Sequence, residues 1–121
     1  MIRFKVIVVG GGPAGSSCAR GLKQAGCKTL ILDKNRFPRP KICAGWVNPD
    51  VFTALGVNPK TYPHTLKQFE RIHFHLFGLK FPVKTRQYAV RRYEFDEWMI
   101  LRAHVPVHIH KVKHISKHKG Y

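Results

Sequence analysis

The chain has 121 residues and 44% hydrophobic content, enough for one modest core and too little for a second full domain. Lys and Arg total 22 against 6 Asp and Glu, and the formal net charge of +16 favours polyanions, acidic partners or anionic membrane surfaces. Three cysteines without a Cys-x-x-Cys pair argue against a disulfide framework or a zinc ribbon, and no segment approaches the ~20 apolar residues of a membrane span. We therefore expect a cytoplasmic protein whose membrane contact, if any, is peripheral.

The first predicted unit runs from Lys5 to Asp33 and reads as strand, helix and strand. An apolar run, residues 6–9, leads into Gly10-Gly11-Gly12-Pro13-Ala14-Gly15. Gly10 allows a sharp turn, Gly12 leaves space for a pyrophosphate, and Gly15 lets the helix approach the strand. Pro13 suits the first turn of a helix. The backbone amides of that turn would face the phosphates. The pattern predicts an α/β fold with a Rossmann-like βαβ unit.

Asp33 closes the second strand at the place where an acid accepts hydrogen bonds from ribose hydroxyls and repels a 2′-phosphate. The unit therefore predicts an adenine dinucleotide with a free ribose, as in FAD or NAD. The alternative is that the glycines only tighten a turn. The helix is expected to bury Ala14, Cys18, Leu22 and Ala25 and to end at Gly26.

The remaining elements follow in chain order. Residues 34–45, with Pro38 and Pro40, predict a loop at the ligand-binding edge of the sheet, and residues 47–56 predict a short helix capped by Asn48. Residues 69–83 alternate in polarity and predict a β-hairpin with one buried face and a turn at residues 77–79.

The C-terminal part is expected to hold a strand at residues 88–92, a helix at 94–103, and strand material at 105–109 and 112–117. The helix should bury Phe95, Trp98 and Met99, with Arg102 on the same face. Eight histidines invite a metal hypothesis, but no Cys, Asp or Glu accompanies the C-terminal group, and we predict a solvated basic face with no metal. That group comprises His104, His108, His110, His114 and His118.

Three segments carry a family resemblance: the glycine fingerprint, Pro38-Arg39-Pro40-Lys41-Ile42-Cys43-Ala44-Gly45, and residues 90–99, VRRYEFDEWM. Together they resemble the geranylgeranyl reductase family of FAD-dependent oxidoreductases, within the hydroxylase-like flavoproteins. The likeness covers essentially the whole chain, whereas family members are several hundred residues long. It implies that residues 1–121 are the N-terminal part of an FAD/NAD(P)-binding domain, with an antiparallel hairpin layer, incomplete relative to the family.

The resemblance also assigns residues to FAD, which it favours over NAD. The cofactor-binding set is Gly10, Gly12, Pro13, Ala14, Gly15, Asp33, Lys34, Arg39, Lys41, Ala44, Gly45 and Arg92. Arg91 is the alternative to Arg92, and Cys43 is placed near the isoalloxazine as the catalytic candidate or as a small residue in a tight loop. The chain departs from the family pattern at Asp33, where Glu is usual, and at Ala44, where glycine is usual.

The implied activity is hydride transfer from reduced flavin to a double bond of an isoprenoid substrate. The chain is expected to be too short to act alone, as a truncated gene, a split gene or a fragment would be. A second chain or an oligomer is one way in which the domain could be completed. A flavin hydroxylase is the alternative enzyme. The charge also motivates a nucleic-acid or anionic-surface module, but no helix-turn-helix or zinc-finger spacing supports nucleic acid.

Overall fold

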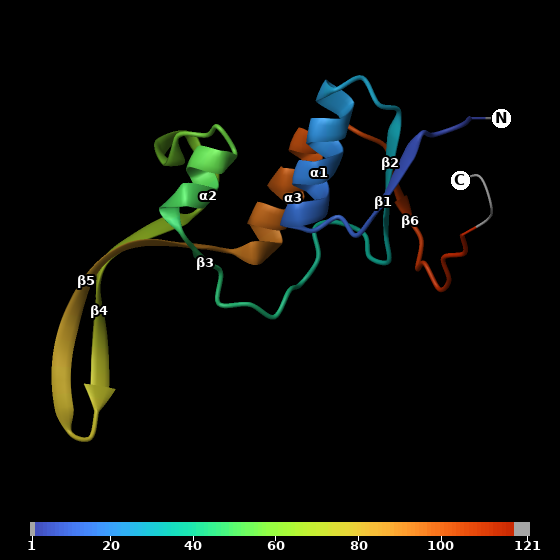
Figure 1. The fold of residues 1–121 in the computed structure, drawn as a ribbon. Helices are drawn as coiled ribbons and strands as arrows, with labels where there is room; N and C mark the ends of the chain where they lie inside the picture. Colours follow the sequence, from blue (N-terminus) through green and yellow to red (C-terminus); the bar gives the residue numbers. More distant parts are fainter. Residues whose placement is uncertain (1, 118–121) are drawn as a thin grey trace. The chain divides into compact units, whose positions relative to one another are not determined.

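The computed structural model describes residues 2–117, which divide into two compact units (Figure 1). Residues up to 39 and from 96 onward form the first unit, and residues 40–95 form the second. The mixed architecture, with one parallel and one antiparallel sheet, confirms the predicted fold class.

A three-stranded parallel sheet organises the first unit. Its strands are β1 (Val6–Val9), β2 (Thr29–Asp33) and β6 (Val107–Ile109), in the order β1-β2-β6. Helix α1 (Pro13–Gln24) connects β1 to β2, as the βαβ prediction requires. Val8, Ile31 and Val107 are register partners, so the β-branched runs stack across the sheet.

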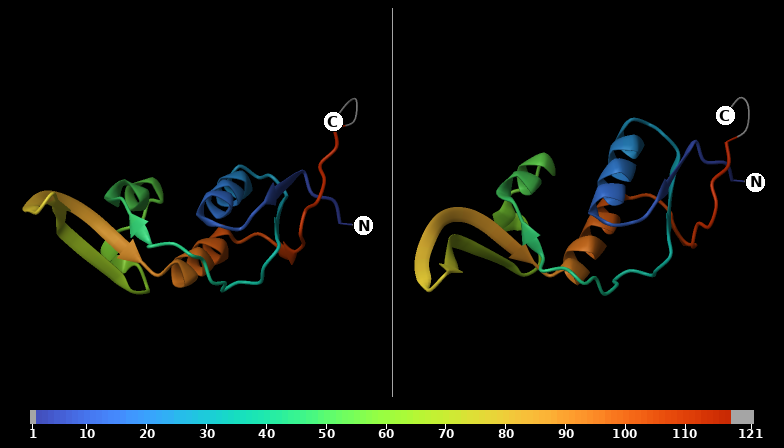
Figure 2. Two further views of the ribbon diagram at one scale, coloured as in Figure 1. Left: turned by 90° about the horizontal axis from the view of Figure 1, so that it is seen from below. Right: turned by 60° about the horizontal axis from the view of Figure 1, so that its bottom comes forward.

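Helices α1 and α3 (Arg92–Ala103) lie side by side in every view (Figures 1 and 2) and share the core of the first unit. Ala19 of α1 packs with Ile31, Ile100 and Ala103. Arg20 Nη1 donates to the carbonyl oxygen of Arg102 at 2.7 Å, and Lys23 Nζ donates to that of His104. These cations satisfy carbonyls at the end of α3, where the helix dipole favours positive charge.

The predicted buried face of α1 is wrong. Ala14, Cys18 and Ala25 are exposed and Leu22 is half-buried, whereas Ser16 and Ala19 are fully buried. The small residues face inward because they let α1 approach the sheet closely, and Ser16 Oγ bonds to the carbonyl of Gly11 at 2.9 Å. The predicted stop is confirmed, since α1 ends before Gly26, whose φ of 77° closes the helix.

An antiparallel sheet organises the second unit. Its strands are β3 (Trp46–Val47), β5 (Leu79–Val90) and β4 (Leu66–Leu76), in the order β3-β5-β4. Helix α2 (Pro49–Ala54) is capped by Asn48, as predicted, and a 3-10 turn spans Pro59–Thr61. Phe52 of α2 is buried and makes edge-to-face contacts with Tyr62, Tyr88 and Phe95, so aromatic packing forms the core of this unit.

Several expected boundaries change. Residues 88–90 belong to the long strand β5, and α3 begins at Arg92. Val47 lies in β3 because it pairs with Tyr88 of β5. Helix α2 therefore spans only residues 49–54. Residues 112–117 form no strand, while residues 118–121, including His118, lie outside the described part of the chain.

The hairpin is confirmed, but its expected buried face is not. Beyond α2, β4 and β5 continue as a curved two-stranded ribbon (Figure 1). Phe74, Leu76, Leu79, Phe81 and Val83 all remain exposed, because nothing in the second unit packs on this part of the ribbon.

Candidate functional site

The glycine loop between β1 and α1 has the backbone geometry that its sequence predicts. Gly10 has a φ of 99°, which favours glycine, and its amide donates to the carbonyl of Leu32 at 2.7 Å. A Cβ at Gly15 would lie 1.8 Å from the carbonyl oxygen of Gly10, and one at Gly11 would lie 2.6 Å from Ile100 Cδ1. The loop therefore packs against α1 and α3 only if these positions lack side chains.

Gly12 differs from its neighbours because it borders open space. A Cβ there would meet only Arg39 Nη2, at 3.6 Å. Gly12 is the N-cap of α1, makes no side-chain cap, and is followed by Pro13 in the first turn. Free amides at a helix N-terminus, next to a guanidinium, suit an anion such as a pyrophosphate.

Asp33 ties the end of β2 to this loop. Its carboxylate is buried, and Oδ2 accepts from the amide of Gly11 at 2.7 Å while Oδ1 accepts from the amide of Asn35 at 2.8 Å. Each oxygen keeps a further acceptor position, which a ribose hydroxyl could use. Sequence reasoning assigned Asp33 to the ligand and missed its bond to the loop. Lys34, the next residue, is exposed.

Arg39 is held over the loop by an ion pair that the sequence did not reveal. Arg39 Nη2 lies 3.5 Å from Asp96 Oδ2, and the guanidinium stacks on Phe37 at 4.9 Å from the ring centroid. The two side chains are 13% and 0% exposed. Arg39 Nε is buried and has no hydrogen-bond partner within residues 2–117. Arg39 Nη2 is the guanidinium atom that lies beside Gly12, where it can donate to a ligand.

Asp96 could have been found from its spacing. It shares a helical face with Ile100 and Ala103, both buried, so an acid interrupts an apolar stripe. A charge at such a position requires a buried partner, and Arg39 is that partner. Elsewhere on α3, burial and the guanidinium of Arg20 lower the pKa of Arg102.

The predicted residues of the second unit form their own cluster. Cys43 Sγ accepts from Arg92 Nη1 at 3.3 Å and from the amide of Gly45 at 3.4 Å. Lys41 and Ala44 are exposed in the same loop. Arg91 instead pairs with Glu94 at 3.5 Å on the surface. The structure thus brings Cys43 and Arg92 together.

Gly45 anchors this loop to β5. It is buried, has a φ of 72°, and its carbonyl accepts from the amide of Val90 at 2.9 Å. A Cβ would lie 1.9 Å from the carbonyl oxygen of Val90. No residue other than glycine fits at this position without displacing the strand.

Gly45→Ala is expected to destabilise the chain by roughly 3 kcal/mol, because a backbone clash is added to an unfavourable φ. Gly78→Ala is the matched control, since Gly78 has a φ of 79° but its Cβ would meet nothing within 4 Å. The control should lose only about 1 kcal/mol. Urea unfolding followed by circular dichroism measures both, and equal losses would contradict the clash.

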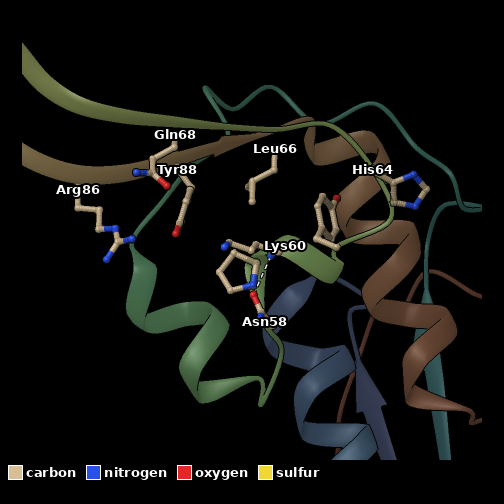
Figure 3. Close-up of a pocket in the computed structure, with 9 residues that line it drawn as sticks. Asn58, Lys60, His64, Leu66, Gln68, Arg86 and Tyr88 are labelled. Carbon is tan, nitrogen blue, oxygen red and sulfur yellow. Dashed lines mark hydrogen bonds between the residues drawn. The ribbon is translucent and has the colours of Figure 1, made fainter.

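Two of the cavities on the second unit differ in the chemistry of their lining. One, of about 460 Å³, has a polar and basic lining (Figure 3) that includes Lys60, His64, Gln68 and Arg86. None of the predicted site residues lines it. The other, of about 300 Å³, is mostly apolar. Its lining residues are Ala44, Trp46, Phe69, Arg71, Ile72 and Ala89.

The histidines and the helices bear on metal binding and on membrane insertion. Within residues 2–117, His, Cys, Asp and Glu side chains form no group of three or more that could hold a metal ion. Among those residues, none of the helices has the length and hydropathy needed to cross a membrane.

The parallel sheet with a glycine loop and an acid at the carboxyl ends of its strands defines a dinucleotide-binding α/β protein. A family model described as an FAD binding domain matches residues 3–107. The chain therefore belongs to the FAD-binding-domain family, and its relatives place it in the geranylgeranyl reductase group. The match confirms FAD as the cofactor.

The similar proteins are longer than this chain. Digeranylgeranylglycerophospholipid reductase 1 of Methanopyrus kandleri is 36% identical over 104 residues, which is 84% of this chain and 28% of the relative. The menaquinone reductase of Mycolicibacterium smegmatis is 43% identical over 53 residues, 44% of this chain and 13% of the relative. The chain thus spans less than a third of these relatives.

Solved structures agree on the fold. A geranylgeranyl bacteriochlorophyll reductase-like protein of Thermoplasma acidophilum superposes with a TM-score of 0.73 at 22% identity, covering 86% of this chain and 29% of that one. The flavin-dependent brominase Bmp2 superposes with a TM-score of 0.78 at 22% identity, covering 95% of this chain and 31% of that one. At these identities the likeness extends to the fold alone.

Proposed function

We propose that the chain supplies the FAD-binding part of an oxidoreductase that reduces a carbon–carbon double bond of an isoprenoid lipid. The observation that carries the cofactor assignment is the guanidinium of Arg39, whose Nη2 lies beside the side-chain-free Gly12. A pyrophosphate would satisfy that donor together with the first amides of α1. The relatives named digeranylgeranylglycerophospholipid reductase support the substrate class.

Each predicted site residue has a proposed role. Gly10, Gly12, Pro13, Ala14 and Gly15 would surround the pyrophosphate, with Arg39 neutralising its charge. The oxygens of Asp33 would accept from the ribose hydroxyls, with Lys34 beside them. Lys41, Ala44, Gly45 and Arg92 would line the path toward the flavin ring.

When bound, reduced FAD would supply the hydride for one carbon of the double bond while the other carbon takes a proton, which would oxidise the flavin and saturate the lipid. The residues of this chain would bind and orient the cofactor and would exclude water from it. Cys43 would lie at the ring, where Arg92 orients its sulfur through the 3.3 Å contact.

The apolar groove next to Ala44 is the proposed place for the isoprenoid chain. Trp46 and Phe69 give it two aromatic walls, and Arg71 is the one charged residue of its lining. An apolar chain with a phosphate at one end matches this combination of apolar walls and a single cation.

A fluorescence titration tests the groove. Trp46 is the only tryptophan left in a Trp98→Phe variant, since the chain has 2 tryptophans. Geranylgeranyl diphosphate is expected to change its emission with saturation, and inorganic pyrophosphate is not. Phe69→Ser should weaken the affinity about tenfold by removing an aromatic contact.

The same preparations are titrated with FAD. FAD binding without any isoprenoid response would contradict the substrate class and leave the flavoprotein assignment standing. Failure to bind FAD would contradict the cofactor site in this chain.

A further inference from the structure

The distal part of the β4–β5 hairpin has two chemically opposite faces. Directly paired residues of an antiparallel ladder share a face of the sheet. One face carries an apolar ribbon of three pairs: Ile72 with Val83, Phe74 with Phe81, and Leu76 with Leu79. The other face pairs Arg71 with Lys84, His73 with Pro82, and His75 with Lys80.

The apolar ribbon is exposed except at Ile72, which is half-buried, and it is most exposed at its end. Leu76 is 56% and Leu79 is 70% exposed, and the rings of Phe74 and Phe81 stack on each other at 5.7 Å between centroids. A contiguous apolar patch of this kind marks an interaction site with a protein or a membrane.

The turn adds an independent observation. Phe77 and Gly78 form a two-residue turn with φ values of 49° and 79°, which is the backbone that Asn-Gly favours. A bulky aromatic residue rarely adopts this conformation, and the Phe77 side chain is 96% exposed. The turn therefore holds an aromatic group in solvent at a cost in backbone strain, and strain of this kind accumulates at functional positions.

The charge of the hairpin selects the partner. Glu70 is the one acidic residue of β4 and β5. Their Lys and Arg residues are Lys67, Arg71, Lys80, Lys84 and Arg86. An apolar strip with an aromatic end, flanked by cations, matches the interior and the headgroups of an anionic bilayer, as in amphipathic segments that lie at the interface.

We propose that the apolar ribbon and Phe77 form a docking surface for an anionic membrane. The turn would enter the headgroup region, and Lys80 and Lys84 would reach the lipid phosphates along their flexible stems. The choice of a membrane as partner rests on the proposed function, because a lipid substrate resides in a bilayer. The position of the docking surface rests on the hairpin alone.

Vesicle co-sedimentation of the full chain tests the surface. The chain is expected to bind phosphatidylglycerol vesicles and to bind phosphatidylcholine vesicles at least about tenfold more weakly. Phe77→Asn should weaken binding to phosphatidylglycerol about tenfold, because it removes the aromatic anchor while placing a favoured residue in the turn. Ile115→Asn is the matched control, since it removes an exposed apolar side chain elsewhere, and should bind as the unchanged chain does.

A second pair of variants separates local charge from net charge. Lys80→Glu/Lys84→Glu and Lys111→Glu/Lys113→Glu change the formal charge equally, and all four lysines are exposed. The hairpin pair should reduce binding at least about tenfold more than the C-terminal pair. Equal effects would overturn the proposal and leave only a general attraction of a basic chain to anionic lipid.

Two further outcomes would overturn it. One is unchanged vesicle binding by Phe77→Asn. The other is a self-associated chain that Phe77→Asn dissociates without altering vesicle binding, which would make the ribbon a contact between copies. FAD titration of the same samples tests the proposed function separately. The docking surface is tested by the vesicle binding alone.

Discussion

Gly12→Val is expected to abolish FAD binding while changing the free energy of unfolding by less than about 1 kcal/mol. Gly12 has φ and ψ of −68° and −179°, an extended conformation that valine adopts readily. A Cβ there meets only the end of the Arg39 side chain at 3.6 Å. The added methyl groups would therefore occupy the space that we propose for the pyrophosphate, without disturbing the loop.

Gly15→Ala provides the contrast. Its Cβ would lie 1.8 Å from the carbonyl oxygen of Gly10, so the glycine loop must shift and both stability and FAD binding should fall. Gly21→Ala is the control, since its Cβ would meet nothing within 4 Å on an exposed part of α1, and it should stabilise the chain slightly.

Flavin fluorescence during titration with FAD, together with urea unfolding, distinguishes these variants. Binding by Gly12→Val at the affinity of the unchanged chain would contradict the proposed pyrophosphate position. Unfolding of Gly12→Val as severe as that of Gly15→Ala would mean that Gly12 serves the fold rather than the ligand.

The sequence sufficed for the elements of the βαβ unit because the signals that begin and end these elements act locally. The β-branched run forms β1, the positive φ at Gly10 ends it, and Pro13 begins α1. Asn48 and Gly26 were likewise assigned correctly, since capping depends on neighbours within one helical turn.

The buried face of α1 could not be obtained in this way. It depends on partners distant in the chain: Arg20 and Lys23 bond to carbonyls of Arg102 and His104 at the end of α3. These bonds, with the packing of Ala19 against Ile100 and Ala103, turn this side of α1 toward α3 and leave Cys18 exposed. Periodicity records which residues share a face and does not record what that face meets.

The hairpin and the site show the same limit. Alternation predicted two faces for residues 69–83 correctly, but burial of one face requires a second layer that the described chain does not place there. Asp33 was assigned to a ribose, and its bond to Gly11 depends on the distance between two loops. Both cases require the tertiary structure.

Arg39→Met is expected to lower the free energy of unfolding by roughly 3 kcal/mol and to weaken FAD binding. The substitution removes the cation from the Asp96 carboxylate, whose side chain is 0% exposed. It also removes the donors that we propose for the pyrophosphate. The single variant therefore combines a structural loss with a loss of ligand contacts, and the two must be separated.

Arg39→Met/Asp96→Asn separates them. The double variant replaces a buried ion pair with neutral side chains, which is often close to neutral for stability, so most of the lost free energy should return. FAD affinity should remain about tenfold to a hundredfold below that of the unchanged chain, because a charged donor to phosphate is still missing. Asp96→Asn alone keeps Arg39 and should bind FAD at least as tightly as the unchanged chain. If the double variant recovered stability and FAD affinity together, Arg39 would be a structural residue, and the pyrophosphate would depend on the glycine loop and the first turn of α1 without it.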